Sequence, residues 1–136
     1  MATEEDVRVI EQVLAAWNRR DLDALLALTD PDARYLNSPE AIEPGTRRGH
    51  DQLARAFRSQ WEGLANSRQE IERTHARGEE IITEGRLVRE MPGSDARLAN
   101  RILLSWTVRD GRVTRLQLLG AGSTSQRALE AAGLSE

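Results

Sequence analysis

Two polar side chains two positions apart, Tyr35 and Asn37, are the strongest candidates for chemistry in this sequence. Because side-chain direction repeats every two residues along a strand, a strand over 33–37 would turn both toward the same face. A phenol and a carboxamide on an inward face can hold a polar group of a ligand or a water molecule. They can equally satisfy hydrogen bonds of the adjoining loop, and the sequence leaves both alternatives open.

Histidine is scarce, so an imidazole acid or base would have to be His50 or His75. A neutral imidazole titrates near physiological pH and can move a proton, but it can also be a hydrogen-bonded structural residue. With only 2 histidines, a three-histidine metal site is excluded. The sequence implies neither a metal nor an organic cofactor.

The composition excludes several other reaction classes. The chain has no cysteine, so disulfides, thiolate nucleophiles and cysteine-ligated metals are absent. All 19 basic residues are arginines, which removes the lysine amine that Schiff-base chemistry and P-loops require. The formal net charge of −3 argues against a nucleic-acid groove, which depends on clustered positive charge.

The length of 136 residues predicts one domain spanning 1–136. No apolar run approaches the ~18 residues of a membrane span, so we expect no membrane association. The N-terminus MATEEDVRVIEQ is acidic where a signal peptide would be basic and then apolar. We therefore expect a cytoplasmic protein.

The first half of the chain predicts helices. Apolar residues recur at helical spacing over 4–19, where Thr3 and Asp6 form a variant of the capping box. Asp21 can cap a short second helix that Asp30-Pro31 ends, and a strand over 33–37 and a loop through Pro44-Gly45 follow. The helical period returns from His50 to about residue 64.

The second half predicts strands over 69–76, 80–91, 98–108 and 112–119. The junctions at 77–79, 92–95 and 110–111 carry turn residues, with Asp110-Gly111 the strongest hairpin signal. Consecutive hairpins form an antiparallel meander, and Ser123 or Ser125 can cap a last helix through Ala132. The order predicts an α+β fold with its helices on one face of a curved sheet.

Three segments give this chain a family resemblance: 16–25 (AWNRRDLDAL), 44–53 (PGTRRGHDQL) and 110–113 (DGRV). On these motifs the chain resembles the nuclear transport factor 2-like superfamily, and in particular its SnoaL-like branch. The resemblance implies a cone-shaped barrel of a curved, mostly antiparallel sheet wrapped around three N-terminal helices, a cystatin-like architecture. It also implies a homodimer through the outer sheet face.

Ketosteroid isomerases of that superfamily need a carboxylate base and an oxyanion hole formed by a tyrosine and a protonated acid. In our alignment, Asn37, Val13 and Leu103 occupy those positions. Because an asparagine cannot accept the proton and Val or Leu cannot donate to an oxyanion, this constellation does not support isomerase chemistry.

The first strand is similar to that of limonene epoxide hydrolases, in which a Tyr-x-Asn-x-Pro stretch positions a water. Tyr35, Asn37 and Pro39 match it, and Glu72-x-x-His75 is similar to the next strand of that group. The Asp-Arg-Asp set of those hydrolases is not matched, because Gly85, Leu87 and Leu118 align with it. A slip of one residue would bring Arg86 into range but would turn the strand over.

We predict a pocket for a small lipophilic ligand, because Trp 3, Tyr 1 and Phe 1 are too few large aromatics to fill a wide cone. Trp17 is expected in the core, and Phe57 and Trp61 in the core or the pocket wall. Trp106 can lie on either sheet face, including a subunit interface, and Arg101 either pairs across a dimer or reaches the pocket. The predicted pocket residues are Tyr35, Asn37, Phe57, Trp61, His75, Leu87, Leu103 and Leu118.

Three functions remain open. The leading hypothesis is a binding or accessory protein that holds its ligand through Tyr35 and Asn37. The alternative is a cyclase, isomerase or hydrolase acting on a polyketide- or terpenoid-like molecule, with His75 as its acid or base. A purely structural dimerisation domain would require a filled core.

Overall fold

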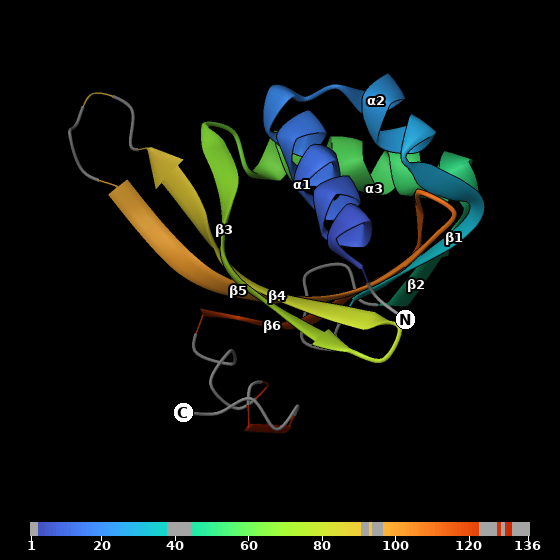
Figure 1. Cartoon of the computed structure of the whole chain (residues 1–136). Coiled ribbons are helices and arrows are strands. Elements are labelled where there is room, and N and C mark those ends of the chain that lie inside the picture. The colour runs from blue at the N-terminus through green and yellow to red at the C-terminus, as the bar shows by residue number, and fades with distance from the viewer. Residues whose placement is uncertain are drawn as a thin grey trace.

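The structure is a computed structural model, and it describes residues 3–37, 45–90, 93, 97–122, 128, 130 and 131 of the chain. Within these residues the chain forms three helices and six strands, shown in Figure 1. In chain order they are α1 (Glu4–Arg19), α2 (Leu22–Ala27), β1 (Thr29–Asn37), β2 (Gly45–Arg48), α3 (Gly49–Gly63), β3 (Ser67–Arg77), β4 (Glu80–Glu90), β5 (Arg97–Arg109) and β6 (Arg112–Ala121). The predicted α+β class is confirmed.

The first two helices begin where the sequence predicts, because their caps satisfy backbone donors. In α1 the Thr3 amide donates to Asp6 Oδ2 over 3.0 Å, and the Asp6 amide donates to Thr3 Oγ1 over 3.3 Å. In α2 the Ala24 amide donates to Asp21 Oδ1 over 3.1 Å. The capping box therefore fixes the start of the helix that carries Trp17.

The six strands form one curved sheet in the order β2-β1-β6-β5-β4-β3, and the helices lie in its hollow (Figure 1). Strands β3 to β6 form the predicted antiparallel meander. Strand β1 pairs with β6 in parallel and with β2 antiparallel. In the described part of the chain the sheet does not close, because β2 and β3 are its edges.

Some boundaries differ from the sequence-based expectation. Strand β1 begins at Thr29, earlier than predicted, and β2 occupies the end of a segment predicted as a loop. This short edge strand carries no alternating apolar pattern, so periodicity does not reveal it. The predicted last helix from Ser123 or Ser125 through Ala132 lies mostly outside the described residues.

The two faces of the sheet bury different sets of apolar residues. On the concave face, which covers the helices, Ile10, Trp17, Leu25, Phe57 and Trp106 belong to one core cluster. On the convex face, Ile82 and Leu103 form a smaller cluster with Leu119 and Ala128 packed against it. No helix in the described part of the chain is long and apolar enough to cross a membrane.

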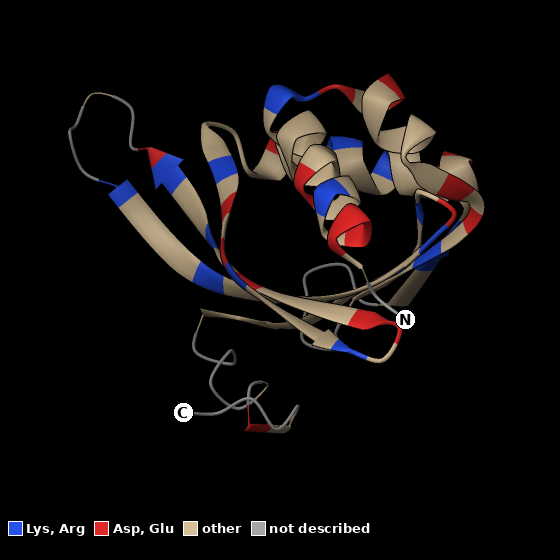
Figure 2. Cartoon of the chain, in the orientation of Figure 1, with Lys and Arg blue, Asp and Glu red and all other residues tan. Residues whose placement is uncertain are grey.

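Strands β4 and β5 extend beyond the helices at one end, and Figure 2 shows arginines on this part of the sheet. These residues are Arg86, Arg89, Arg97 and Arg101. Several are paired: Arg89 donates to the Gly63 carbonyl over 2.8 Å, and Arg101 lies 3.3 Å from Glu84. Arg101 thus pairs with an acidic residue of β4, whereas Arg89 is held by a backbone carbonyl of α3.

Candidate ligand-binding cavity

A cavity of about 480 Å³ lies between the helices and the concave face of the sheet. Every element except α2 contributes to its wall, which is mostly apolar. The lining residues are Val13, Leu14, Trp17, Tyr35, Asn37, Arg47, Ala56, Phe57, Ser59, Gln60, Gly63, Leu64, Gln69, Leu87, Ile102, Leu104, Trp106, Leu116, Leu118 and Ala121. The core is therefore not filled, as the small number of aromatic residues predicts.

Aromatic side chains support one side of the cavity. The rings of Tyr35 and Phe57 lie 6.5 Å apart between centroids, and those of Phe57 and Trp61 lie 6.4 Å apart. Trp61 also packs at 6.4 Å from Trp17 and donates its indole N–H to the Trp17 carbonyl over 3.1 Å. Such contacts restrain the ring orientations, so this wall is held in place by packing.

A hydrogen-bonded network of three neutral side chains crosses the cavity wall. The Trp17 indole N–H donates to Gln60 Oε1 over 3.0 Å, and Gln60 Nε2 donates to the Tyr35 hydroxyl oxygen over 3.1 Å. We refer to this as the Trp17–Gln60–Tyr35 network. It joins α1, α3 and β1, so the polar groups of the cavity are positioned by three separate elements.

Tyr35 remains a neutral phenol over the ordinary pH range. Burial raises its pKa above the usual 10.0, while the hydrogen bond from Gln60 and the positive charge of Arg47 offset part of that rise. Arg47 faces Tyr35 across the β1–β2 ladder. Tyr35 therefore acts in the cavity as a hydrogen-bonding hydroxyl rather than as a base.

The Trp-Asn-Arg-Arg part of the family motif fixes the rim of the cavity. Asn18 donates to the Gln69 carbonyl over 3.0 Å and accepts from the Gln69 amide over 2.8 Å. Arg20 donates to the carbonyls of Leu64 and Ser67, and its guanidinium lies 4.6 Å from the centre of the Trp17 ring. These residues attach α1 to the start of β3, so their role in the structure is architectural.

Five of the predicted pocket residues line the cavity: Tyr35, Asn37, Phe57, Leu87 and Leu118. Trp61 does not line it and packs behind Phe57 and Trp17. Trp17 belongs to the core cluster, as expected, and also forms part of the cavity wall. Trp106, for which either face was open, faces the cavity and donates to Thr83 Oγ1 over 2.9 Å.

The prediction that Leu103 lines the pocket is wrong. Its neighbours Ile102 and Leu104 line the cavity, whereas Leu103 is buried on the convex face against Ile82. Side chains alternate between the two faces, so an alignment shifted by one residue places a whole strand the wrong way round.

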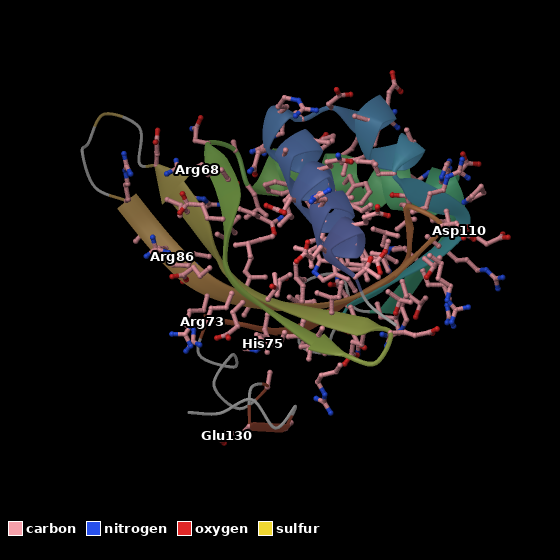
Figure 3. All side chains as sticks on the ribbon, in the orientation of Figure 1. Arg68, Arg73, His75, Arg86, Asp110 and Glu130 are labelled. Carbon is pink, nitrogen blue, oxygen red and sulfur yellow. The ribbon has the colours of Figure 1, made fainter. Side chains whose placement is uncertain are left out.

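The prediction that His75 lines the pocket is wrong as well. His75 Nε2 lies 2.5 Å from Glu84 Oε2, and Glu84 Oε1 lies 3.3 Å from the Arg101 guanidinium. Figure 3 shows His75 on the side of the sheet away from the helices. Of the two alternatives for Arg101, the pocket is wrong, because Arg101 does not line the cavity and pairs with Glu84 on the convex face.

The strand register also excludes the one-residue slip that would turn Arg86 into the cavity. Arg86 lies 3.7 Å from Glu70 and 3.8 Å from Glu72, and it does not line the cavity. Next to it, Gly85 has a structural reason to be glycine. A Cβ there would lie 2.3 Å from the Glu70 carbonyl oxygen, where β3 carries an irregularity.

Sequence reasoning missed Gln60, the central residue of the network. Its spacing held a usable signal, because Leu53, Phe57, Gln60 and Leu64 follow one helical stripe, and a glutamine on an apolar stripe needs a buried partner. Arg47, Ser59 and Gln69 also line the cavity without having been predicted. Arg47 lies on the edge strand that the sequence did not reveal.

Among the described lining residues, Arg47 carries the only formal charge, and none is an aspartate, glutamate or histidine. A search of the described residues likewise finds no group of three or more acidic or histidine side chains that could hold a metal ion. The described wall can therefore enclose an apolar molecule and hydrogen-bond to it, with Tyr35, Asn37, Ser59, Gln60 and Gln69 as its neutral polar groups.

A curved sheet around three helices, with an apolar cavity between them, defines the nuclear transport factor 2-like class of α+β proteins. More narrowly, the chain belongs to the SnoaL-like domain family, whose sequence pattern matches residues 10–116. No curated protein matches the chain.

Solved structures share this fold. TerC, crystallised with polyporic acid, has a TM-score of 0.70 at 19% identity, over 85% of this chain and 90% of that one. An NTF2-like protein from Burkholderia xenovorans has a TM-score of 0.67 at 24% identity, over 97% and 98%. An LEH-like epoxide hydrolase from M. tuberculosis has a TM-score of 0.68 at 25% identity, over 85% and 82%.

Proposed function

We propose that this protein binds a small, largely apolar molecule in the cavity on the concave face, in a binding or accessory role. The observation that carries the proposal is the cavity of about 480 Å³ itself, with its apolar wall and a few convergent polar groups. Ligand pockets typically enclose about 300 to 1,000 Å³ and have this composition. The restrained aromatic side and the Trp17–Gln60–Tyr35 network further favour a preformed site.

The fold neighbours support this proposal by analogy. One of them, TerC, was crystallised with polyporic acid, so a protein of this fold has been obtained with a small organic molecule. Function varies widely on one fold, so the cavity residues of this chain carry more weight than the neighbour's ligand.

The test is a thermal-shift titration of the purified protein with small apolar compounds, comparing two leucine variants. Leu87→Trp fills the cavity from its wall, whereas Leu98→Trp enlarges a side chain that is 54% exposed on β5. A ligand at one hundred times its Kd adds about 2.7 kcal/mol of stability. We expect the shift to persist in Leu98→Trp and to disappear in Leu87→Trp. An equal shift in both variants would overturn the proposal, as would the absence of any shift.

An epoxide hydrolase is the second candidate, because Tyr35 and Asn37 line one cavity wall in the order found in the limonene epoxide hydrolase group. A structural neighbour is also described as an LEH-like epoxide hydrolase. Such a reaction needs an acid to protonate the epoxide oxygen and a base to activate water. The described lining offers no carboxylate, and His75 lies on the other face of the sheet.

Diol formation from a cyclic terpene epoxide separates the two candidates. Under the binding proposal, the wild-type protein forms diol no faster than buffer does. Diol formation that Asn37→Ala abolishes and His75→Gln leaves intact would establish the hydrolase instead.

The predicted homodimer stays a prediction, which sedimentation equilibrium would test.

A further inference from the structure

In the Trp17–Gln60–Tyr35 network, the donor-to-acceptor direction of both hydrogen bonds is fixed by the Trp17 indole. An indole N–H can only donate, so the atom of Gln60 that meets Trp17 must be the carbonyl oxygen Oε1. The amide nitrogen of Gln60 then faces Tyr35 and donates to the phenolic oxygen. The orientation of the amide group is therefore set by a donor-only neighbour.

This direction leaves the Tyr35 hydroxyl with its own hydrogen to donate. A phenolic hydroxyl can accept and donate at the same time, and its acceptor position is the one that Gln60 uses. None of the hydrogen bonds described for residues 3–37, 45–90 and 97–122 has the Tyr35 hydroxyl as donor. Because Tyr35 lines the cavity, that hydrogen is available to a molecule inside it.

The hydroxyl also keeps this hydrogen under ordinary conditions. Burial raises the pKa of Tyr35 despite the nearby positive charge of Arg47. In an apolar wall an unused donor is costly, so a ligand that supplies an acceptor gains more than it would in water.

We propose that the cavity selects lipophilic ligands with a hydrogen-bond acceptor oxygen, such as a ketone or quinone carbonyl, over molecules of the same shape that lack an acceptor or carry only a donor. This rests on the proposed function and adds the chemical class of the ligand. Tyr35 is the residue that contacts the ligand oxygen, and Gln60 is the positioning residue that makes Tyr35 a donor.

Three rigid tricyclic molecules of nearly equal shape test this selectivity. Fluorenone carries an acceptor oxygen, fluorene carries a methylene group at the same position, and carbazole carries an N–H donor there. One neutral hydrogen bond corresponds to about a fivefold to tenfold change in Kd. We expect the wild-type protein to bind fluorenone about that much more tightly than fluorene, and carbazole no more tightly than fluorene.

Two substitutions separate Tyr35 from Gln60. Tyr35→Phe removes the hydroxyl, so the preference for fluorenone over fluorene should disappear while the Kd of fluorene stays within about twofold. Gln60→Glu replaces the donating amide nitrogen with a carboxylate oxygen that accepts from Tyr35. The phenolic oxygen then faces the cavity as an acceptor, and the preference should move from fluorenone to carbazole.

Gln12→Glu is the matched control, because Gln12 is exposed on α1 and does not line the cavity. It should keep the preference for fluorenone. Equal Kd values for the three ligands in the wild type would overturn this inference and leave the proposed function intact. Binding of none of the three would contradict both. A fluorenone preference that persists in Tyr35→Phe would assign the donor to another residue and overturn the role of Tyr35.

Discussion

The two faces of the sheet hold polar groups in opposite ways. On the concave face, Trp17, Gln60 and Tyr35 are neutral and hydrogen-bond to one another in a line across the cavity wall. On the convex face, His75, Glu84 and Arg101 form an ion-paired group. The charged side chains of this group thus lie on the face away from the cavity.

This difference shows why residue type alone misleads in this chain. His75 is the residue most suited to proton transfer, yet it lies outside the cavity. Gln60 carries no charge and does not titrate, yet it sets the hydrogen-bonding direction of the wall. A residue can therefore act on a ligand only if its side chain faces the cavity, whatever its chemical type.

The largest expected effect comes from removing the main aromatic of the concave face. Trp106 is 1% exposed and donates to Thr83. Trp106→Ala should lower the free energy of unfolding by about 3–5 kcal/mol, because it removes buried contacts and enlarges the cavity. Chemical denaturation monitored by circular dichroism measures this. A loss under about 1 kcal/mol would contradict the packing of the concave face.

Leu103→Ala tests the convex face in the same way. Leu103 is also 1% exposed, and Leu119 and Ala128 pack on its cluster. We expect a loss of about 2–5 kcal/mol in the free energy of unfolding, with the ligand affinity of the cavity unchanged. If ligand affinity falls while stability holds, Leu103 faces the cavity after all and the register is wrong.

Tyr35 allows a direct measurement of concave-face burial, because it is the only tyrosine in the chain. Its folded-state pKa is raised by burial above the unfolded value near 10.0. The folded state therefore holds the phenolic proton more tightly. Its contribution to stability is complete below pH ~10 and is lost as the pH rises through the folded-state pKa.

The absorbance of tyrosinate, followed as the pH of the folded protein is raised, gives this pKa. We expect a midpoint above that of the unfolded chain in denaturant. The alkaline fall in the free energy of unfolding should also become shallower in Tyr35→Phe. A midpoint at or below the unfolded value would show that the Tyr35 hydroxyl is exposed to solvent.

The smallest effect is expected for the ion-paired group of the convex face. The His75 and Glu84 side chains are 27% and 13% exposed, and Arg101 is about half exposed. Partly exposed pairs contribute little, so Arg101→Gln should change the free energy of unfolding by about 1 kcal/mol or less. Ligand affinity should not change. If Arg101→Gln changed ligand affinity as much as Tyr35→Phe does, ligand binding would not depend on the concave face alone.

Most elements of the fold could be predicted from the sequence, because local signals specify them. The cap at Thr3, the helical stripe of α1 and the Asp110-Gly111 turn each predict an element that the structure contains. The cavity was only partly predictable. Tyr35 and Asn37 share a face by alternation alone, whereas the position of Leu103 depends on a pairing register that no local pattern records.

The hydrogen-bond partners in the Trp17–Gln60–Tyr35 network could not be predicted from local sequence patterns either. Trp17, Tyr35 and Gln60 lie on three elements, and only the tertiary packing of α1 and α3 on β1 brings their polar atoms within hydrogen-bonding distance. The stripe position of Gln60 shows that it needs a partner but not which one. Arg47 is hidden for a simpler reason, because β2 has no apolar alternation.

The parallel pairing of β1 with β6 has a consequence for the order in which the molecule assembles. Thr29 lies beside Val113 and Leu36 beside Gln117. The strand that carries Tyr35, β1, therefore pairs toward the middle of the sheet only with β6, which follows the other five strands in the chain. The meander of β3 to β6 forms from hairpins that are close in sequence, whereas this seam joins distant parts of the chain and carries a larger loop-closure cost. During synthesis, β1 must therefore wait for nearly the whole domain to emerge before its pairing is complete.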